Sequence, residues 1–293
     1  MSGPTCPSCR LDWVSSAASS SRVGFGGGPQ ARPRSALLSA IGDSPWTYRL
    51  IVLVIFAVLW EVYATNANSL IIPTFSETIV RTGQLLVDAG VWRAFIDSNQ
   101  ALVIGFAVSV VLGIPLGLAA ARFERLEKFL DPYINIMLVT PTAGLIPIFL
   151  MALGLSLASR VALVFVFAIP MLIVNSRAGV RQVDPSLIEM STSFLANERT
   201  IWRKVLLPGA LPAIMTGVRL AVGRAITGMV IVELLMFAVG IGQLIINARG
   251  RFDGPTLYGV VILIVLESLV LISAARWLER RVAPWANESV LAD

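Results

Sequence analysis

The chain has 293 residues, of which 56% are hydrophobic and only 14% are charged. A soluble domain carries about 25% charged residues, so this composition excludes an ordinary soluble fold and indicates a surface that faces lipid. The net charge is +5, and the absence of histidine excludes imidazole metal sites and histidine general bases. Because the basic residues lie between apolar runs, we attribute them to membrane topology and anionic lipid, not to nucleic acid.

Residues 1–45 are rich in Ser, Gly, Pro and Arg, and they hold too little apolar surface to fold. We expect a disordered cytoplasmic tail that is not a secretory signal, because no apolar core precedes a cleavage site. A misassigned start codon is an open alternative. Cys6 and Cys9 supply half of a four-ligand zinc site, and no second pair completes it.

Six apolar runs follow, close to the roughly 20 residues that a membrane-spanning helix needs. They cover Tyr48–Ala64, Ala101–Ala121, Tyr133–Leu155, Ser159–Val174, Ala213–Leu235 (which Met236–Ile246 could extend) and Leu257–Ala275. The predicted fold is therefore an all-α membrane protein with six transmembrane helices. Between the first two runs, residues 65–100 contain Pro73 and recurring charges, and they predict an external interfacial helix instead of a span.

The distribution of Lys and Arg predicts the orientation. Basic residues concentrate in the tail, in the loop after the second run, in the loop after the fourth run and at the C-terminus. This bias places both termini in the cytoplasm. We divide the chain into a tail (1–45), the first helix with its external segment (46–94), the main transmembrane domain (95–285) and a C-terminal tail (286–293).

The cytoplasmic loop from Asn175 to Pro212 is too long for a simple turn. Asp184 can cap a short helix that has Pro185 at its first position, where proline is tolerated. Asn197 can cap a second short helix, Glu198–Leu207, which Pro208 would close. The loop therefore predicts two short helices below the membrane, and an ordinary interfacial hairpin explains this pattern as well as a docking site does.

This loop resembles the EAA motif of bacterial ABC importer permeases, in which Glu-Ala-Ala is followed by a glycine and then by Ile-x-Leu-Pro. The matching positions keep their spacing without a gap: Glu189, Met190, Ser191, Leu195, Val205, Leu207 and Pro208. Segments before the loop resemble other parts of this family: Gly113–Gly117, Asp131-Pro132 and Leu145–Pro147. After the loop, Gly217–Leu220, Arg224 and Glu233 resemble its nitrate/sulfonate/taurine type. The resemblance covers roughly residues 95–285.

The resemblance implies a type I importer permease whose loop forms coupling helices on a separate ATPase subunit. It implies two ATPase copies, an external solute-binding protein, a homodimer in the bacterial inner membrane, and a small anionic solute such as a sulfonate, taurine or nitrate. Glutamate 189 would belong to the ATPase contact. ATP would bind to the partner subunit, and we expect no cofactor, no metal and no enzymatic site in this chain.

Leu195 departs from the family pattern, because a glycine at this turn would take a positive φ freely. A leucine in that region costs about 1–2 kcal/mol. Either the turn has another geometry, or Asn197 supplies the left-handed residue. The bulky Met190 is a second departure, and both bear on the docking geometry.

Charges and helix breakers inside the runs are candidates for the transport pathway: Glu233, Arg224, Glu267 and Pro141. For Arg224 and Glu233, helix-to-helix hydrogen bonding is the competing interpretation. No Walker A loop is present, since the only lysines, Lys128 and Lys204, follow Glu127 and Arg203. An ATP-independent channel or secondary carrier, or a membrane scaffold, remains as an alternative function.

Overall fold

A computed structural model describes residues 45–67, 72–235 and 239–287, and all regular structure within these ranges is helical. The predicted tail and both cysteines lie outside the described residues, except for Pro45. The chain divides between Val54 and Ile55 into two compact units. The described part of the first unit is the beginning of α2 (Pro45–Ala67), and the packing described below is that of the second unit.

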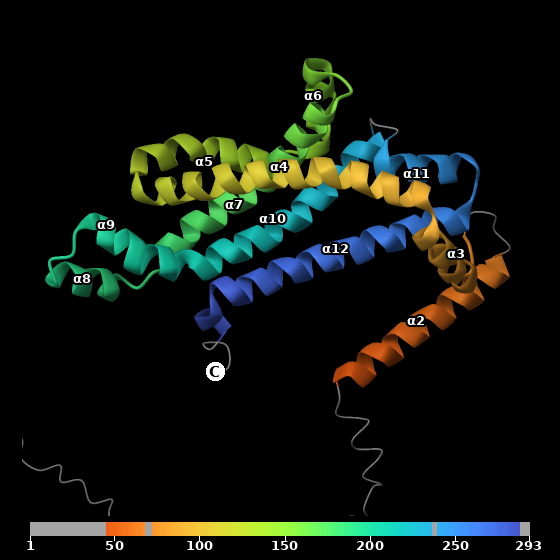
Figure 1. Ribbon diagram of the computed structural model, residues 1–293, viewed down its shortest axis with the longest axis horizontal. Helices are drawn as coiled ribbons and strands as arrows, with labels where there is room; N and C mark the ends of the chain where they lie inside the picture. Colours follow the sequence, from red (N-terminus) through yellow and green to blue (C-terminus); the bar gives the residue numbers. More distant parts are fainter. Residues whose placement is uncertain (1–44, 68–71, 236–238, 288–293) are drawn as a thin grey trace, which may run out of the picture. The chain divides into compact units, whose positions relative to one another are not determined.

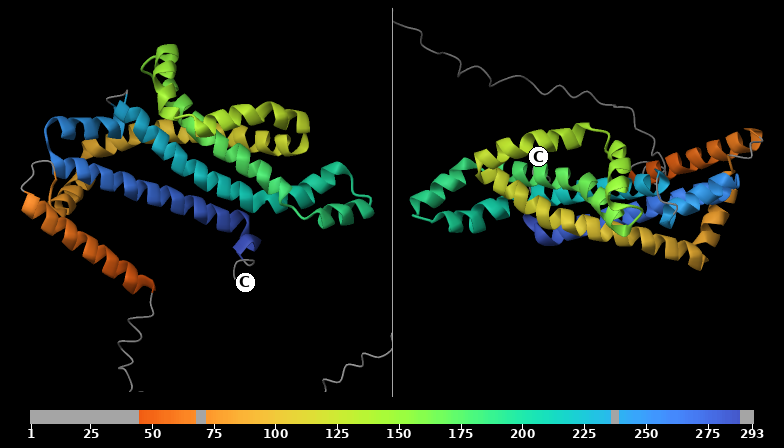
Figure 2. Two further views of the ribbon diagram at one scale, coloured as in Figure 1. Left: turned by 180° about the vertical axis from the view of Figure 1, so that it is seen from behind. Right: turned by 90° about the horizontal axis from the view of Figure 1, so that it is seen from above.

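Three long helices form the centre of the second unit: α4 (Ala89–Arg122), α7 (Leu157–Arg181) and α10 (Leu207–Leu235). They lie side by side in both views, and α12 (Gly254–Val282) packs on α10 (Figures 1 and 2). Their buried faces are apolar, with Leu102, Leu172 and Met229 in one common cluster. Five described helices are long and apolar enough to cross a membrane.

A row of small residues on α4 lets α7 approach closely. Gly105, Ser109, Gly113 and Gly117 recur every fourth residue and are all buried. A β-carbon at Gly117 would lie 2.6 Å from the Ile173 carbonyl oxygen, and one at Gly105 would lie 2.8 Å from the Val161 carbonyl oxygen. Helices in membranes associate through such contacts of small residues, because lipid gives them no hydrophobic driving force.

The predicted third span is broken. It consists of α5 (Glu124–Val139), a 3-10 turn (Thr142–Leu145) and α6 (Ile146–Leu153), and the two halves meet at 100°. Pro141 lies at the break and forces the preceding Thr140 into an extended conformation. The count of six spans holds if this bent pair crosses the membrane once.

The other predicted boundaries also change. The fourth span runs to Arg181 and not to Val174, so the loop behind it is shorter than predicted. Residues 89–100 belong to α4 and lengthen the second span at its N-terminal end, whereas the separate helix α3 (Phe75–Val87) begins at a Thr74–Glu77 capping box. The extension of the fifth span through Ile246 is wrong, because Gly240 (φ 61°) starts a new helix, α11 (Gly240–Gly250).

Candidate functional site

The predicted hairpin is present, beyond one end of α7 and α10, while α3 and α11 lie at the other end (Figures 1 and 2). Its first arm is α8 (Pro185–Ser193), with Asp184 as the N-cap and Pro185 in the first turn, as predicted. The Ser186 N–H donates to the Asp184 carboxylate at 2.8 Å. This backbone hydrogen bond holds the pKa of Asp184 below its usual value.

The turn between the arms is a Schellman motif with Leu195 as its left-handed residue (φ 56°). The Leu195 N–H donates to the Thr192 carbonyl (2.9 Å), and the Ala196 N–H donates to the Ser191 carbonyl (3.1 Å). The prediction that Asn197 could take the left-handed conformation is wrong, since its φ is −73°. Leu195 itself therefore accepts the backbone strain of about 1–2 kcal/mol that glycine would avoid.

The second arm begins at Asn197 as predicted, but it is not closed by Pro208. Asn197 caps α9 (Glu198–Ile201) through the Thr200 N–H at 2.9 Å. A π-helical segment (Trp202–Leu206) then leads directly into α10, so Pro208 does not close a separate helix. Proline cannot donate to the carbonyl four residues earlier, and the wider turn, with Leu207 N–H bonded to Trp202, accommodates this loss.

The motif residues do not form one surface. Glu189, Met190 and Leu195 are exposed on the first arm and the turn. Val205 instead packs into the apolar cluster beneath the hairpin, around Val180 and Leu206. Ser191 is half-buried, and its hydroxyl donates to the Leu187 carbonyl at 2.7 Å. Leu207 and Pro208 lie at the start of α10, so they connect the hairpin to the span.

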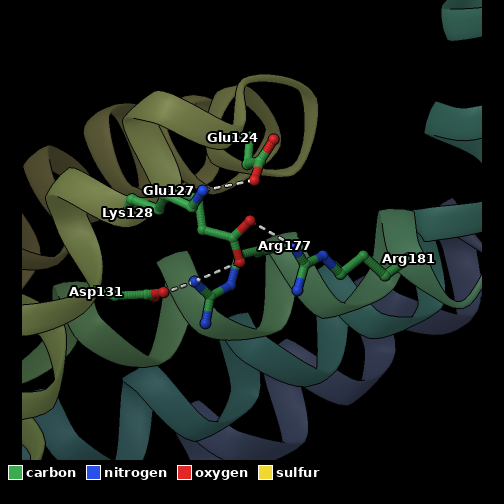
Figure 3. Close-up of polar contacts among 6 residues, drawn as sticks. All are labelled: Glu124, Glu127, Lys128, Asp131, Arg177 and Arg181. Atoms are coloured by element: carbon green, nitrogen blue, oxygen red, sulfur yellow. Dashed lines mark hydrogen bonds and ion pairs between the residues drawn. The ribbon is translucent and has the colours of Figure 1, made fainter.

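Ion pairs connect neighbouring helices to the second arm and to the end of α7, which leads into the first arm. At the end of α7, Arg177 contacts Glu127 (3.2 Å) and Asp131 of α5, and Arg181 also contacts Glu127 (Figure 3). The side chains of Arg177 and Glu127 are only 19% and 13% exposed, so this part of the network is shielded from water. On the second arm, Glu198 pairs with Arg122 at the end of α4 (2.5 Å).

Sequence reasoning missed these pairs, because residues about 50 positions apart are brought together only by the packing of α5 on α7. In the sequence, only two features hinted at these ion pairs. One is Asp131-Pro132 after the second apolar run, and the other is the group of basic residues after the fourth run. The exposed pair Lys128–Glu124 on α5 is a surface contact of one helix turn and adds little (Figure 3).

Glu233 is fully buried at the other end of the spans. It accepts hydrogen bonds from the Ser98 hydroxyl (2.8 Å) and the Gly242 N–H (3.1 Å), and Arg160 lies 3.6 Å away. The carboxylate thus joins α4, α7 and α10 to the N-terminus of α11, where negative charge is favourable. Its three partners come from separate elements, so no local pattern in the sequence identified them.

The remaining pathway candidates lie apart from Glu233. Arg224 is exposed on α10 and borders a small cavity of about 40 Å³ beside Thr140 and Thr142, next to the break at Pro141. Glu267 on α12 accepts a hydrogen bond from Asn99 of α4 in a largely apolar groove. Within the described ranges, no three His, Cys, Asp or Glu side chains are grouped as metal ligands would be.

Comparisons with known proteins agree with this architecture. Residues 113–285 match the family model of the binding-protein-dependent transport system inner membrane component. The putative aliphatic sulfonates transport permease protein SsuC of Bacillus subtilis is 26% identical over 83% of this chain and 88% of its own length. The taurine transport system permease protein TauC of Escherichia coli is 26% identical over 70% of this chain and 74% of its own length.

A solved structure supports the fold. An inward-facing form of the MetNI methionine ABC transporter contains a chain that aligns with a TM-score of 0.54, covering 68% of this chain and 96% of that one. At 23% identity, this likeness concerns the fold alone. It agrees with the helical transmembrane architecture described above.

Proposed function

Because the chain belongs to the family of binding-protein-dependent transport system inner membrane components, we propose that it forms the translocation pathway of an ATP-driven importer. The hairpin 184–208 couples the pathway to a separate ATPase subunit. Two copies of this chain assemble with two ATPase subunits in the bacterial inner membrane, and an external binding protein delivers the solute. Both termini lie in the cytoplasm, and the chain has no catalytic role of its own.

The construction of the hairpin carries this proposal. A coupling element has to transmit force from ATPase closure to the spans, so it has to be stiff and attached at both ends. Each arm has a side-chain N-cap. The second arm is paired with α4 through Glu198 and Arg122, and the end of α7 that leads into the first arm is paired with α5 through Arg177 and Glu127. The Glu189 carboxylate is exposed and has no hydrogen-bond or ion-pair partner among the described residues, which leaves it free to bind another subunit.

For the solute, we propose a small anion such as a sulfonate, taurine or nitrate. The names of the similar sulfonate and taurine permeases support this class. Formylaminopyrimidine is the alternative, because the permease ThiX of Halalkalibacterium halodurans is 27% identical over 79% of this chain. Measuring which compound binds to the partner binding protein distinguishes the two. A channel or secondary carrier is less consistent with the hairpin, since neither needs a braced cytoplasmic lever.

Charge reversal tests the coupling role. Glu189→Lys should abolish co-purification of the ATPase subunit and ATP-dependent uptake in proteoliposomes, while the amount of protein in the membrane stays unchanged. Glu124→Lys is the matched control, because Glu124 is also an exposed glutamate near this end of the spans, and its ion pair among the described residues is with Lys128 of its own helix. Uptake that survives Glu189→Lys, or that falls equally with Glu124→Lys, would contradict the proposed role of Glu189.

A further inference from the structure

Two described residues other than glycine have a positive φ, Leu195 (56°) and Phe252 (55°). Both occupy the same position of a Schellman motif, at the C-terminal ends of α8 and α11. Leu195 is 94% exposed, so its side chain gains almost no packing against the described residues. The Schellman hydrogen bonds hold the backbone in this conformation, but they would form with glycine as well and without the strain. The leucine side chain therefore points to a benefit outside the described part of the chain.

Leu195 continues an apolar stripe along α8. Leu187, Met190 and Phe194 lie at positions i, i+3 and i+7, and their exposed fractions are 44%, 54% and 79%. The opposite side of α8 is already used, because Ile188 packs on the cluster beneath the hairpin. The helix therefore has a second apolar face that no described residue covers. Such spacing is typical of a helix that binds in the groove of another protein.

The charges near the stripe favour a protein groove over the bilayer surface. α8 contains Glu189 and no Lys or Arg, whereas a helix that lies on an anionic membrane carries basic residues on its polar face. The basic residues stand on the second arm, where Arg199, Arg203 and Lys204 border a hollow of about 510 Å³. A matching partner has an apolar groove for α8 and acidic side chains opposite this hollow.

We propose that Phe194 and Leu195 form an apolar anchor that inserts into a pocket of the ATPase subunit and selects the subunit that fits it. The inference rests on the proposed function, because it takes the ATPase as the partner of the hairpin. Glycine at position 195 would relax the turn but would remove the side chain that fills the pocket. The turn itself needs the left-handed backbone, whereas the leucine side chain at this position serves binding.

The two left-handed residues provide matched variants. Leu195→Gly and Phe252→Gly relieve the same strain, but at opposite ends of the spans. The full chain in nanodiscs is titrated with each ABC-type ATPase subunit of the source genome, purified separately. We expect Leu195→Gly to weaken the tightest pair about tenfold, as for an interface anchor. Leu195→Asn should weaken it equally, whereas Leu195→Met and Phe252→Gly should bind like the wild type.

Three outcomes would overturn the proposal. Unchanged affinity for Leu195→Gly would show that the leucine is only tolerated. Equal weakening by Phe252→Gly would show that relief of strain, and not loss of a contact, causes the effect. A spin label at position 195 that collides with oxygen but not with a water-soluble nickel complex would place this residue in the bilayer. If the wild type binds none of the ATPases, the proposed function itself fails.

Discussion

Single side chains determine where the hairpin begins and turns. Asp184 and Asn197 each cap an arm through a hydrogen bond to a backbone N–H of the first turn. Both caps were predictable, because a cap depends on residues that are neighbours in sequence. The conformation of Leu195 was not, since the two hydrogen bonds of the Schellman motif fix its φ against the preference of leucine.

The Asp184 cap should make the first arm sensitive to pH. The pKa of Asp184 is lowered in the folded state by its bond to the Ser186 N–H. Its contribution to stability is therefore complete above the unfolded pKa, near 3.9, and is lost as the pH falls through the lower folded value. A nitroxide at position 192, with Cys6 and Cys9 replaced by serine, should become more mobile over this acidic range.

Asp184→Asn is the control for this titration, because asparagine caps a helix about as well but does not ionise. Its nitroxide mobility should stay constant over the same acidic range. If both proteins respond alike, the acid sensitivity of the arm comes from another group.

At the scale of the helices, the central packing depends on the small residues of α4. Gly117→Ala would place a β-carbon 2.6 Å from the Ile173 carbonyl oxygen, and the backbone of α7 would have to move. Such overpacking costs about 1–3 kcal/mol. The expected result is a lower midpoint of thermal unfolding in detergent.

Gly223→Ala offers the comparison on α10, because nothing lies within 4 Å of a β-carbon there. Alanine favours a helix over glycine by up to about 1 kcal/mol, so this variant should unfold at the wild-type temperature or slightly higher. Equal losses for the two variants would mean that close approach of α4 and α7 does not limit stability.

The prolines of the apolar runs do not by themselves predict which helices are broken. Pro141 breaks the third span, whereas Pro115, Pro170 and Pro212 remain inside continuous helices. Pro141 is followed by Gly144 and Pro147, so several helix-disfavouring residues act together. An isolated proline in a membrane helix is tolerated because neighbouring helices and local changes of the turn satisfy the freed carbonyl. The presence of a proline alone therefore could not predict whether a helix is broken or continuous.

The start of α11 could not be predicted from the sequence, for a different reason. The apolar residues 236–246 are consistent with a longer fifth span, but the left-handed Gly240 starts a separate helix. A β-carbon at Gly240 would lie 2.2 Å from the Ser98 hydroxyl oxygen and 2.8 Å from Glu233. The position of α11 is thus determined by buried groups of α4 and α10, which no sequence window contains.

For the whole molecule, the helical class and five of the apolar spans were predictable, because apolar length is a property of each segment alone. The break at Pro141 leaves the sixth span dependent on whether the bent pair α5 and α6 crosses once. The orientation remains a prediction from the basic residues. If it is correct, the hairpin is cytoplasmic and α11 is external. The directions of α7, α10 and α12 require that these two elements face opposite sides.

Cysteine labelling tests this orientation. In a chain with Cys6 and Cys9 replaced by serine, Ser193→Cys and Asn247→Cys each introduce one exposed thiol. We expect a membrane-impermeant maleimide to label position 247 from outside intact spheroplasts, and position 193 only in inverted vesicles. The reverse pattern would contradict cytoplasmic termini.

The ion pairs around the hairpin have a practical consequence for chimeric transporters. Exchanging residues 182–208 between permeases would transfer the cap residues and the apolar stripe. It would leave behind Arg177 and Arg181, together with their acidic partners on α5, and would separate Glu198 from Arg122. A functional transplant therefore has to include residues 122–131 and the end of α7, so the exchangeable module is discontinuous in sequence.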